Sequence, residues 1–174
     1  MTGKDITMWS LIKTRKMPPT RMVRYCCDEL KERTGEAGDT VFTGVRWEKS
    51  KDRREQQMVN FYKGKIMVRI IVDWTEIEVW SFILTEGAPY CELYDKGFDR
   101  IGCIGCPLSS NQKKELALYP KYRENYIRSF ETMIKNGTED GKVYQWKTGE
   151  EVMKWWLGNC EVQRKEIDGQ CSMF

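Results

Sequence analysis

Two cysteine pairs that lie far apart in the sequence constrain this chain more than any other feature. The first is the tandem Cys26-Cys27, and the second is Cys103 and Cys106, which are separated by two residues. A two-residue gap lets both thiolates reach one metal centre, and the glycines beside them let the backbone turn around it. The pattern favours a metal site shared by distant parts of the chain.

The tandem pair bears on the kind of metal centre. Adjacent helical residues point about 100° apart, so Cys26 and Cys27 can grip two corners of something bulky, such as a cubane iron–sulfur cluster. Such clusters take four cysteinyl ligands. A structural zinc ion held by the same cysteines is the competing interpretation. Plain burial of the thiols, or a redox pair at Cys103 and Cys106, is also open.

The composition narrows the classes of function. The chain has 174 residues, enough for one domain with its own core, and no apolar run of membrane-spanning length. Seven cysteines without a secretory signal pattern favour metal or redox chemistry in the cytoplasm over a disulfide framework. The absence of histidine excludes Cys-His zinc fingers and serine–histidine triads. The net charge of +3 does not by itself require a nucleic-acid partner.

Hydrophobic periodicity and capping signals predict an α/β fold: a small sheet of two or three strands with five or six surrounding helices. We expect one domain over residues 1–158, followed by a tail over 159–174. Strands are predicted at residues 41–47 and 65–72. Helices are predicted at residues 6–13, at 21–33 with Thr20 as N-cap, after a Thr75–Glu78 capping box, from Pro120 to Asn136-Gly137, and after a Thr148–Glu151 capping box.

Two of these helices carry an apolar stripe. In the helix at residues 21–33 the stripe consists of Val23, Cys26, Cys27 and Leu30, which directs the tandem thiols inward. In the helix that begins at Pro120 an aromatic stripe predicts core packing; its members are Tyr122, Tyr126, Phe130, Met133 and Ile134.

A polar and mostly charged loop, residues 48–54, follows the strand predicted at 41–47. Open α/β sheets bind ligands beyond the carboxyl ends of their strands. Arginine guanidinium groups in such a loop suit sulfate or phosphate, because they can grip two oxygens. The loop is therefore a candidate anion site, and a solvated surface is the plainer alternative.

Four motifs in a fixed order resemble the phosphoadenosine phosphosulfate (PAPS) reductase family, which includes adenylylsulfate reductases and related adenine nucleotide alpha hydrolases. The motifs run from about residue 8 to 157: Cys-Cys-x-x-Leu-Lys, Thr-Gly-Val-Arg-x-x-x-Ser-x-x-Arg, Val-Asp-Trp-Thr-x-x-x-Val-Trp-x-Phe-Ile and Tyr-Asp-x-Gly-Phe-x-Arg-Ile-Gly-Cys-x-x-Cys-Pro. Each motif is weak alone, and the combination is specific. The resemblance covers the second half of a PAPS reductase-like domain.

The resemblance implies a metal centre and its neighbour. Family members with both cysteine pairs bind a [4Fe–4S] cluster, which makes the predicted ligands Cys26, Cys27, Cys103 and Cys106. The lysine just after the tandem pair, Lys31, is implied to lie near both cluster and substrate.

The resemblance also nominates a substrate site. The second motif matches the family's segment for the sulfate or phosphate end of an adenine sulfonucleotide. This implies that Arg46, Ser50 and Arg53 bind the substrate, with Arg54 as a weaker candidate, which agrees with the anion site expected in this loop.

Two family features are not found in the sequence. One is a Ser-Gly-Gly-x-Asp-Ser type turn that cradles the nucleotide phosphates, and we expect a partner subunit to supply it. The other is a C-terminal Glu-Cys-Gly-x-His type motif that carries the nucleophile. The tail instead holds Cys171 in a different context, so we assign Cys171 no redox role and leave the catalytic residues unassigned.

Two kinds of function follow. The first is an iron–sulfur PAPS reductase-like protein of sulfur metabolism that acts on or binds an adenylyl sulfate-type nucleotide. If active, it would be an oxidoreductase or an adenylyl-activating component of sulfur transfer. The alternative is a non-catalytic, metal-stabilised binding or regulatory subunit. Its partner would then be a nucleic acid that undergoes sulfur modification.

Overall fold

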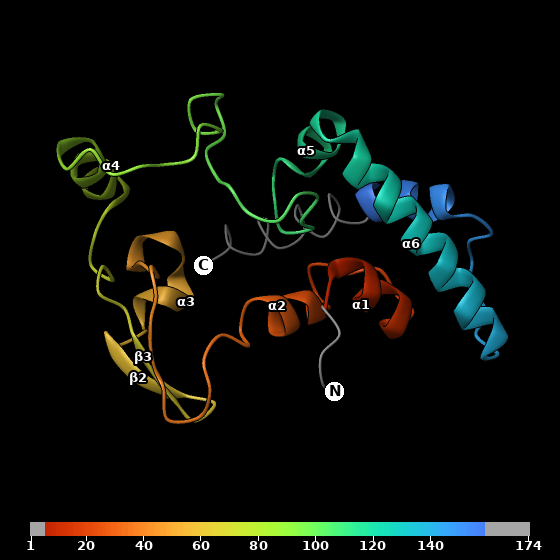
Figure 1. The fold of residues 1–174 in the computed structure, drawn as a ribbon, viewed down its shortest axis with the longest axis horizontal. Coiled ribbons are helices and arrows are strands. Elements are labelled where there is room, and N and C mark those ends of the chain that lie inside the picture. The colour runs from red at the N-terminus through yellow and green to blue at the C-terminus, as the bar shows by residue number, and fades with distance from the viewer. Residues whose placement is uncertain (1–5, 159–174) are drawn as a thin grey trace. The chain divides into compact units, whose positions relative to one another are not determined.

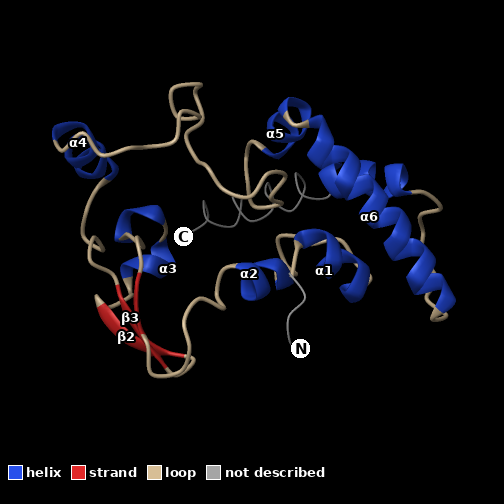
Figure 2. Cartoon of the chain, viewed as in Figure 1, coloured by secondary structure: helices blue, strands red, loops and turns tan. Residues whose placement is uncertain are grey.

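The computed structural model describes residues 6–158, shown in Figures 1 and 2. The chain divides into two compact units. Among the described residues, the cysteine unit consists of 6–32 together with 94–158, and the sheet unit is Arg33–Leu93. In sequence, the sheet unit is therefore inserted between the two cysteine pairs. The tail predicted at 159–174 lies outside the described residues, so its boundary stays a prediction.

The cysteine unit is helical in its described residues. Its helices are α1 (Met8–Arg15), α2 (Tyr25–Leu30), α5 (Gln112–Leu118), α6 (Pro120–Glu139) and a helical stretch at 149–158. The sequence predicts all of these except α5. The capping signal at Thr148 is present, since the Thr148 hydroxyl accepts from the Glu151 N–H at 3.2 Å. The Glu151 carboxylate accepts instead from the Lys147 N–H at 2.7 Å.

Aromatic residues form the core of the cysteine unit. Tyr126, Phe130 and Met133 on α6 are buried, as their spacing predicts. The Phe130 and Trp156 rings meet edge to face with centroids 5.5 Å apart. The remaining buried members of this core come from α1, α5 and residues 149–158: Ile12, Leu116, Val152 and Met153.

Helix α6 continues past the predicted stop at Asn136-Gly137 and ends at Glu139. Gly137 lies against the ring of Tyr144, where an added Cβ would overlap the phenol. The Tyr144 hydroxyl donates to the Lys16 carbonyl at 3.0 Å. The glycine therefore permits a close helix–ring approach and does not end the helix.

Helix α2 is shorter than the predicted 21–33. It begins after Arg24, and the Thr20 hydroxyl accepts from the Val23 N–H (3.1 Å) in a preceding turn. Thr20 as N-cap is therefore wrong: its hydroxyl closes a turn before the helix. Val23 and Leu30 are exposed, so only the two cysteines of the predicted stripe face inward.

The sheet unit contains a three-stranded mixed sheet, which confirms the α/β class. The strands are β1 (Thr40–Phe42), β2 (Val59–Tyr62) and β3 (Lys65–Val68), in the order β1-β3-β2. β1 runs parallel to β3, and β2 runs antiparallel to it. Outside the sheet lie a 3₁₀ turn (Trp47–Lys49), α3 (Lys51–Arg54) and α4 (Glu76–Thr85).

The strands differ from the prediction in length and number. β1 and β3 cover only the first parts of 41–47 and 65–72: after Phe42 the backbone is irregular up to the 3₁₀ turn, and after Arg69 the chain turns. β2 was not predicted. It joins β3 through Lys63 and Gly64, both with positive φ (48° and 77°), the conformation of a tight type I′ hairpin. The Thr75–Glu78 capping box at the start of α4 is confirmed.

None of the helices in residues 6–158 combines the length and the apolar character that a bilayer requires.

Candidate functional site

The cysteine unit gathers the four predicted ligand thiols. Helix α2 carries Cys26 and Cys27, and a turn closed by a 3.1 Å hydrogen bond from the Cys106 N–H to the Cys103 carbonyl carries the other pair. The thiol of Cys26 interacts electrostatically with those of Cys27, Cys103 and Cys106. Segments more than 70 residues apart in sequence therefore lie near enough for their thiols to interact electrostatically.

Burial makes these thiols reluctant to ionise without a compensating charge. It raises the pKa of Cys26 to about 12, with negative charge on Cys27 and Cys106 acting in the same direction. Burial also raises the pKa of Cys106, which the Lys31 ammonium opposes. Thiolates bind metals, so an all-sulfur donor set with mutual repulsion suits a cationic centre. In the described part of the chain, however, no three cysteine or acidic side chains are already placed to hold a metal ion.

A buried polar network fixes the loop that carries Cys103 and Cys106. The Glu115 carboxylate accepts from the Gly105 N–H and from the Ser109 hydroxyl, each at 2.8 Å. The Gln112 side chain donates to the Gly105 carbonyl at 3.1 Å. These bonds satisfy backbone groups that would otherwise be buried without partners.

Two further features determine the shape of this loop. The Tyr126 hydroxyl donates to the Ile104 carbonyl at 3.0 Å. Gly105 has φ +73°, and an added Cβ would lie 2.9 Å from Leu116 and 3.0 Å from Tyr126. Only glycine combines that backbone conformation with that space.

The sequence does not predict these supporting residues. It places Tyr126 only in the core stripe and indicates no role for Glu115 or Gln112. A Glu in a helix just after a Cys-x-x-Cys loop has no distinctive sequence signal, whereas the glycine between the cysteines was a visible clue.

Lys31 lies at the carboxyl end of α2, as C-cap, and its side chain is exposed. Its charge acts on the thiol of Cys106. Lys31 thus lies near enough to affect Cys106, while its implied closeness to a cluster and a substrate stays a prediction. Cys171 lies outside the described residues.

The sheet unit contains the other three predicted residues. Arg46 is buried, and its guanidinium lies 3.7 Å from Glu48 and 3.9 Å from Glu76. Its Nη1 atom nevertheless has no hydrogen-bond partner. The loop thus offers a buried cation, but carboxylates already neutralise part of its charge.

Ser50 and Arg53 follow Arg46 in the same loop. Ser50 is exposed and precedes α3 without capping it through its side chain. Arg53 is half-buried within α3, and its N–H donates to the Ser50 carbonyl at 3.2 Å. The sheet unit therefore holds the three anion-site candidates, and the cysteine unit holds the thiols and Lys31.

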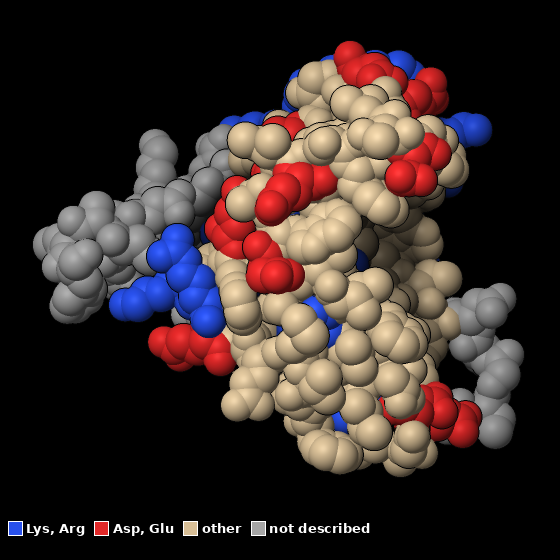
Figure 3. All heavy atoms as spheres, turned by 90° about the vertical axis from the view of Figure 1, so that its left-hand side faces the viewer, with Lys and Arg blue, Asp and Glu red and all other residues tan. Residues whose placement is uncertain are grey.

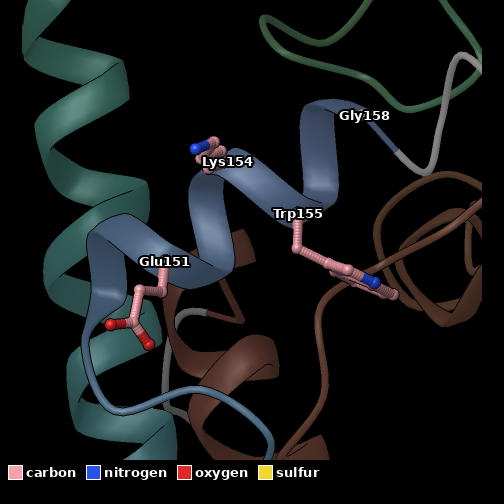
Figure 4. Close-up of a pocket in the computed structure, with 4 residues that line it drawn as sticks. All are labelled: Glu151, Lys154, Trp155 and Gly158. Atoms are coloured by element: carbon pink, nitrogen blue, oxygen red, sulfur yellow. The ribbon is translucent and has the colours of Figure 1, made fainter.

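A surface hollow of about 460 Å³ lies elsewhere in the cysteine unit, lined by Glu151, Lys154, Trp155 and Gly158. Figure 4 shows the labelled side chains pointing in different directions from their helix. No predicted site residue lines this hollow, and its polar groups do not converge on one point.

Fold and site together define a small α/β protein that gathers four thiols beside a lysine. Comparison with known sequences gives the family: the phosphoadenosine phosphosulfate reductase domain matches residues 6–109. The chain belongs to this family, as the motifs indicate.

Relatives include proteins with and without a named activity. An uncharacterized protein of Methanocaldococcus jannaschii is 29% identical over 163 residues, covering 80% of this chain and 32% of the relative. The adenosine 5'-phosphosulfate reductase of Neisseria meningitidis serogroup A is 36% identical over 89 residues, covering 48% of this chain and 36% of the relative. The enzyme of that name from Shouchella clausii is 34% identical over 87 residues, covering 47% and 36%.

The chain thus spans about a third of the length of these curated relatives. No solved structure matches it significantly.

Proposed function

We propose that this chain is an iron–sulfur protein of sulfur metabolism that binds an adenylyl sulfate-type nucleotide together with a partner polypeptide. The observation that carries the proposal is the electrostatic interaction of the Cys26 thiol with those of Cys27, Cys103 and Cys106, which come from segments far apart in sequence. Seven cysteines and no histidine make sulfur the available soft donor. A reducing, cytoplasmic setting suits these free thiols.

Each group has a proposed role. The residues that would hold a [4Fe–4S] cluster are Cys26, Cys27, Cys103 and Cys106. Such a cluster, when bound, supplies a local electrostatic field and redox capacity. The ammonium of Lys31, close to Cys106, would stabilise negative charge on a substrate.

The Arg46 loop is proposed to bind the anionic end of the nucleotide. Arg46 has a buried nitrogen without a hydrogen-bond partner, and Ser50 and Arg53 follow it in the same loop. The names of the N. meningitidis and S. clausii relatives support a sulfonucleotide as the ligand class. A partner would contribute the glycine-rich phosphate loop.

One observation favours the alternative of a non-catalytic binding or regulatory subunit. Glu48 and Glu76 lie beside the Arg46 guanidinium and reduce the positive charge open to an anion. In that case the Arg46 loop is structural and the chain has no nucleotide affinity. Steeply salt-dependent binding of nucleic acid would support this alternative.

Iron content after oxygen-free purification tests the cluster. We expect about four irons per chain and a broad brown absorbance that bleaches on reduction. Cys106→Ser should lose both, because a ligand is removed. Cys91→Ser, at an exposed thiol, is the matched control and should keep them. One zinc and no colour would leave a structural metal site instead.

Nucleotide binding tests the Arg46 loop. Arg46→Ala should weaken binding of adenosine 5'-phosphosulfate by about 1.5–3 kcal/mol, the scale of a hydrogen bond to a charged group. Calorimetric titration measures it, with Arg128→Ala, an exposed arginine on α6 in the cysteine unit, as control. Equal affinities of the parent chain and Arg46→Ala would remove this loop from the site.

A further inference from the structure

The two faces of the small sheet differ in polarity. Paired residues in neighbouring strands point to the same side, and successive residues alternate. From the register, one face carries Val41, Asn60, Tyr62, Lys65 and Met67. The other face, here called the apolar sheet face, is formed by Thr40, Phe42, Val59, Phe61, Ile66 and Val68.

The polar side of the sheet is the covered one. The Lys65 ammonium is buried and donates to the Thr34 carbonyl at 2.7 Å. Just beyond β3, Arg69 is buried as well, and it donates to the Gln57 carbonyl at 2.7 Å and to Asn60 at 2.8 Å. Charged side chains are normally exposed and apolar ones buried. In this sheet Lys65 and Arg69 are buried, whereas Phe42 and Phe61 are exposed.

The apolar sheet face, by contrast, is open. Phe42 is 66% exposed and Phe61 is 79% exposed. No helix among the described residues packs extensively along the strands. Figure 3 shows mostly uncharged residues on this side of the molecule, with a few basic atoms among them and acidic side chains at the edges. Two largely exposed phenylalanine rings on one face of a sheet are apolar surface that a partner could cover, although the area is small.

The outer edge of β1 is open as well. The Asp39 carbonyl and the Thr43 N–H bond to β3, at 2.9 and 2.8 Å. Alternate residues direct their backbone groups to opposite edges, so the N–H and C=O groups of Thr40 and Phe42 point away from β3. Proteins protect exposed edges with charges or proline, and β1 has neither.

We propose that the apolar sheet face and the free edge of β1 bind a partner polypeptide, which adds a strand beside β1 and lays an apolar helix face across the sheet. This rests on the proposed function, because the partner is the polypeptide proposed there to carry the phosphate loop. Parallel strand pairs such as β1–β3 occur in sheets that helices cover on both faces.

The size of the patch and the length of the relatives both favour a larger partner. Three strands of about four residues present roughly 200 Å², far below the ~800 Å² per partner of a stable interface. Two copies joined through this face alone are therefore too weakly held. The relatives are about three times longer than their matched segment, so in those proteins it works beside further polypeptide.

A site-specific crosslinker tests the proposal. The full chain with Phe61→p-benzoylphenylalanine is irradiated in the cells that naturally produce it, and the products are identified by mass spectrometry. We expect one crosslinked polypeptide that contains a glycine-rich phosphate loop between a strand and a helix. The same crosslinker at Val143, which is 98% exposed in the cysteine unit, should not capture it.

Other outcomes overturn the proposal. These are crosslinks only to a second copy, only within the same chain, to a polypeptide without that loop, or to none. Phe61→Asp should lower recovery of the identified partner at least tenfold, while Val143→Asp should not change it. Iron content is measured in the same preparations. Iron without the partner overturns this inference and leaves the proposed cluster standing, and the partner without iron overturns only the proposed cluster.

Discussion

The two units of the chain solve the problem of burial in opposite ways. The cysteine unit buries an aromatic core that includes Phe130 and Trp156, and its polar network supports the loop with Cys103 and Cys106. In the sheet unit, Val72 is the only apolar residue that is fully buried among those described, while Arg46, Lys65 and Arg69 are buried. One unit therefore has its own source of stability, and the other gains little from apolar burial.

This difference indicates that the cysteine unit is stable by itself, whereas the stability of the sheet unit depends on a partner. Apolar area removed from water is the main favourable contribution to folding, and the cysteine unit holds both apolar core clusters found in the described chain. A sheet with an uncovered apolar face gains that contribution only when something covers it. Substitutions in the two units should therefore have different consequences for the isolated chain.

The largest contrast is expected between two phenylalanines. Phe130→Ala, at a fully buried site, should lower the free energy of unfolding by about 3–5 kcal/mol. Phe61→Ala, on the apolar sheet face, should change it by less than about 0.5 kcal/mol. Denaturant unfolding followed by tryptophan fluorescence measures both. Similar costs would mean that the isolated chain buries Phe61 in solution.

A smaller effect is expected from the network under the cysteine loop. Glu115→Ala leaves the Gly105 N–H and the Ser109 hydroxyl buried without their acceptor, which should cost about 2–4 kcal/mol. Thermal and denaturant unfolding provide the measurement. Glu124→Ala, at an exposed position on α6, is the control. A cost no greater than that of the control would show that the loop does not depend on this carboxylate.

The smallest effect is expected at the start of α4. Hydrogen bonds from Thr75, chiefly from its backbone N–H, lower the pKa of Glu78 below its usual value. Between the folded and unfolded pKa values the unfolded state binds more protons, so the contribution of the ionised carboxylate is lost as the pH falls through the folded pKa. Hydrogen exchange should show the first turn of α4 opening more readily in acid.

Glu78→Gln should abolish that pH dependence, and Glu86→Gln at the other end of the helix should retain it. If exchange from α4 has the same acid dependence in Glu78→Gln as in the parent chain, the capping box does not cause it.

Features that depend on residues close together in sequence could be predicted from the sequence. A capping box needs only Thr75 and Glu78, three residues apart, and it appears as predicted. The family motifs likewise place Cys103, Cys106 and their glycines in one loop. The fold class follows because strand and helix patterns alternate along the chain.

Features that depend on tertiary contacts could not be predicted in the same way. Asn136-Gly137 looks like a helix end, but the ring of Tyr144 explains the glycine. Strand β2 is short, and its apolar residues Val59 and Phe61 are exposed, although the Lys63-Gly64 turn beside it was a usable hairpin signal. Which face of the sheet is covered depends on Thr34 and Gln57, whose contacts no pattern encodes.

The insertion of Arg33–Leu93 between the two halves of the cysteine unit also separates the synthesis of the two cysteine pairs in time. At a ribosomal rate of about 5–20 residues per second, Cys106 is added on the order of 4–16 s after Cys27. During that interval the tandem thiols emerge without the loop that later joins them. The newly made chain is therefore most open to oxidation or stray metal before the second pair arrives, and slower translation of the insertion lengthens that exposure.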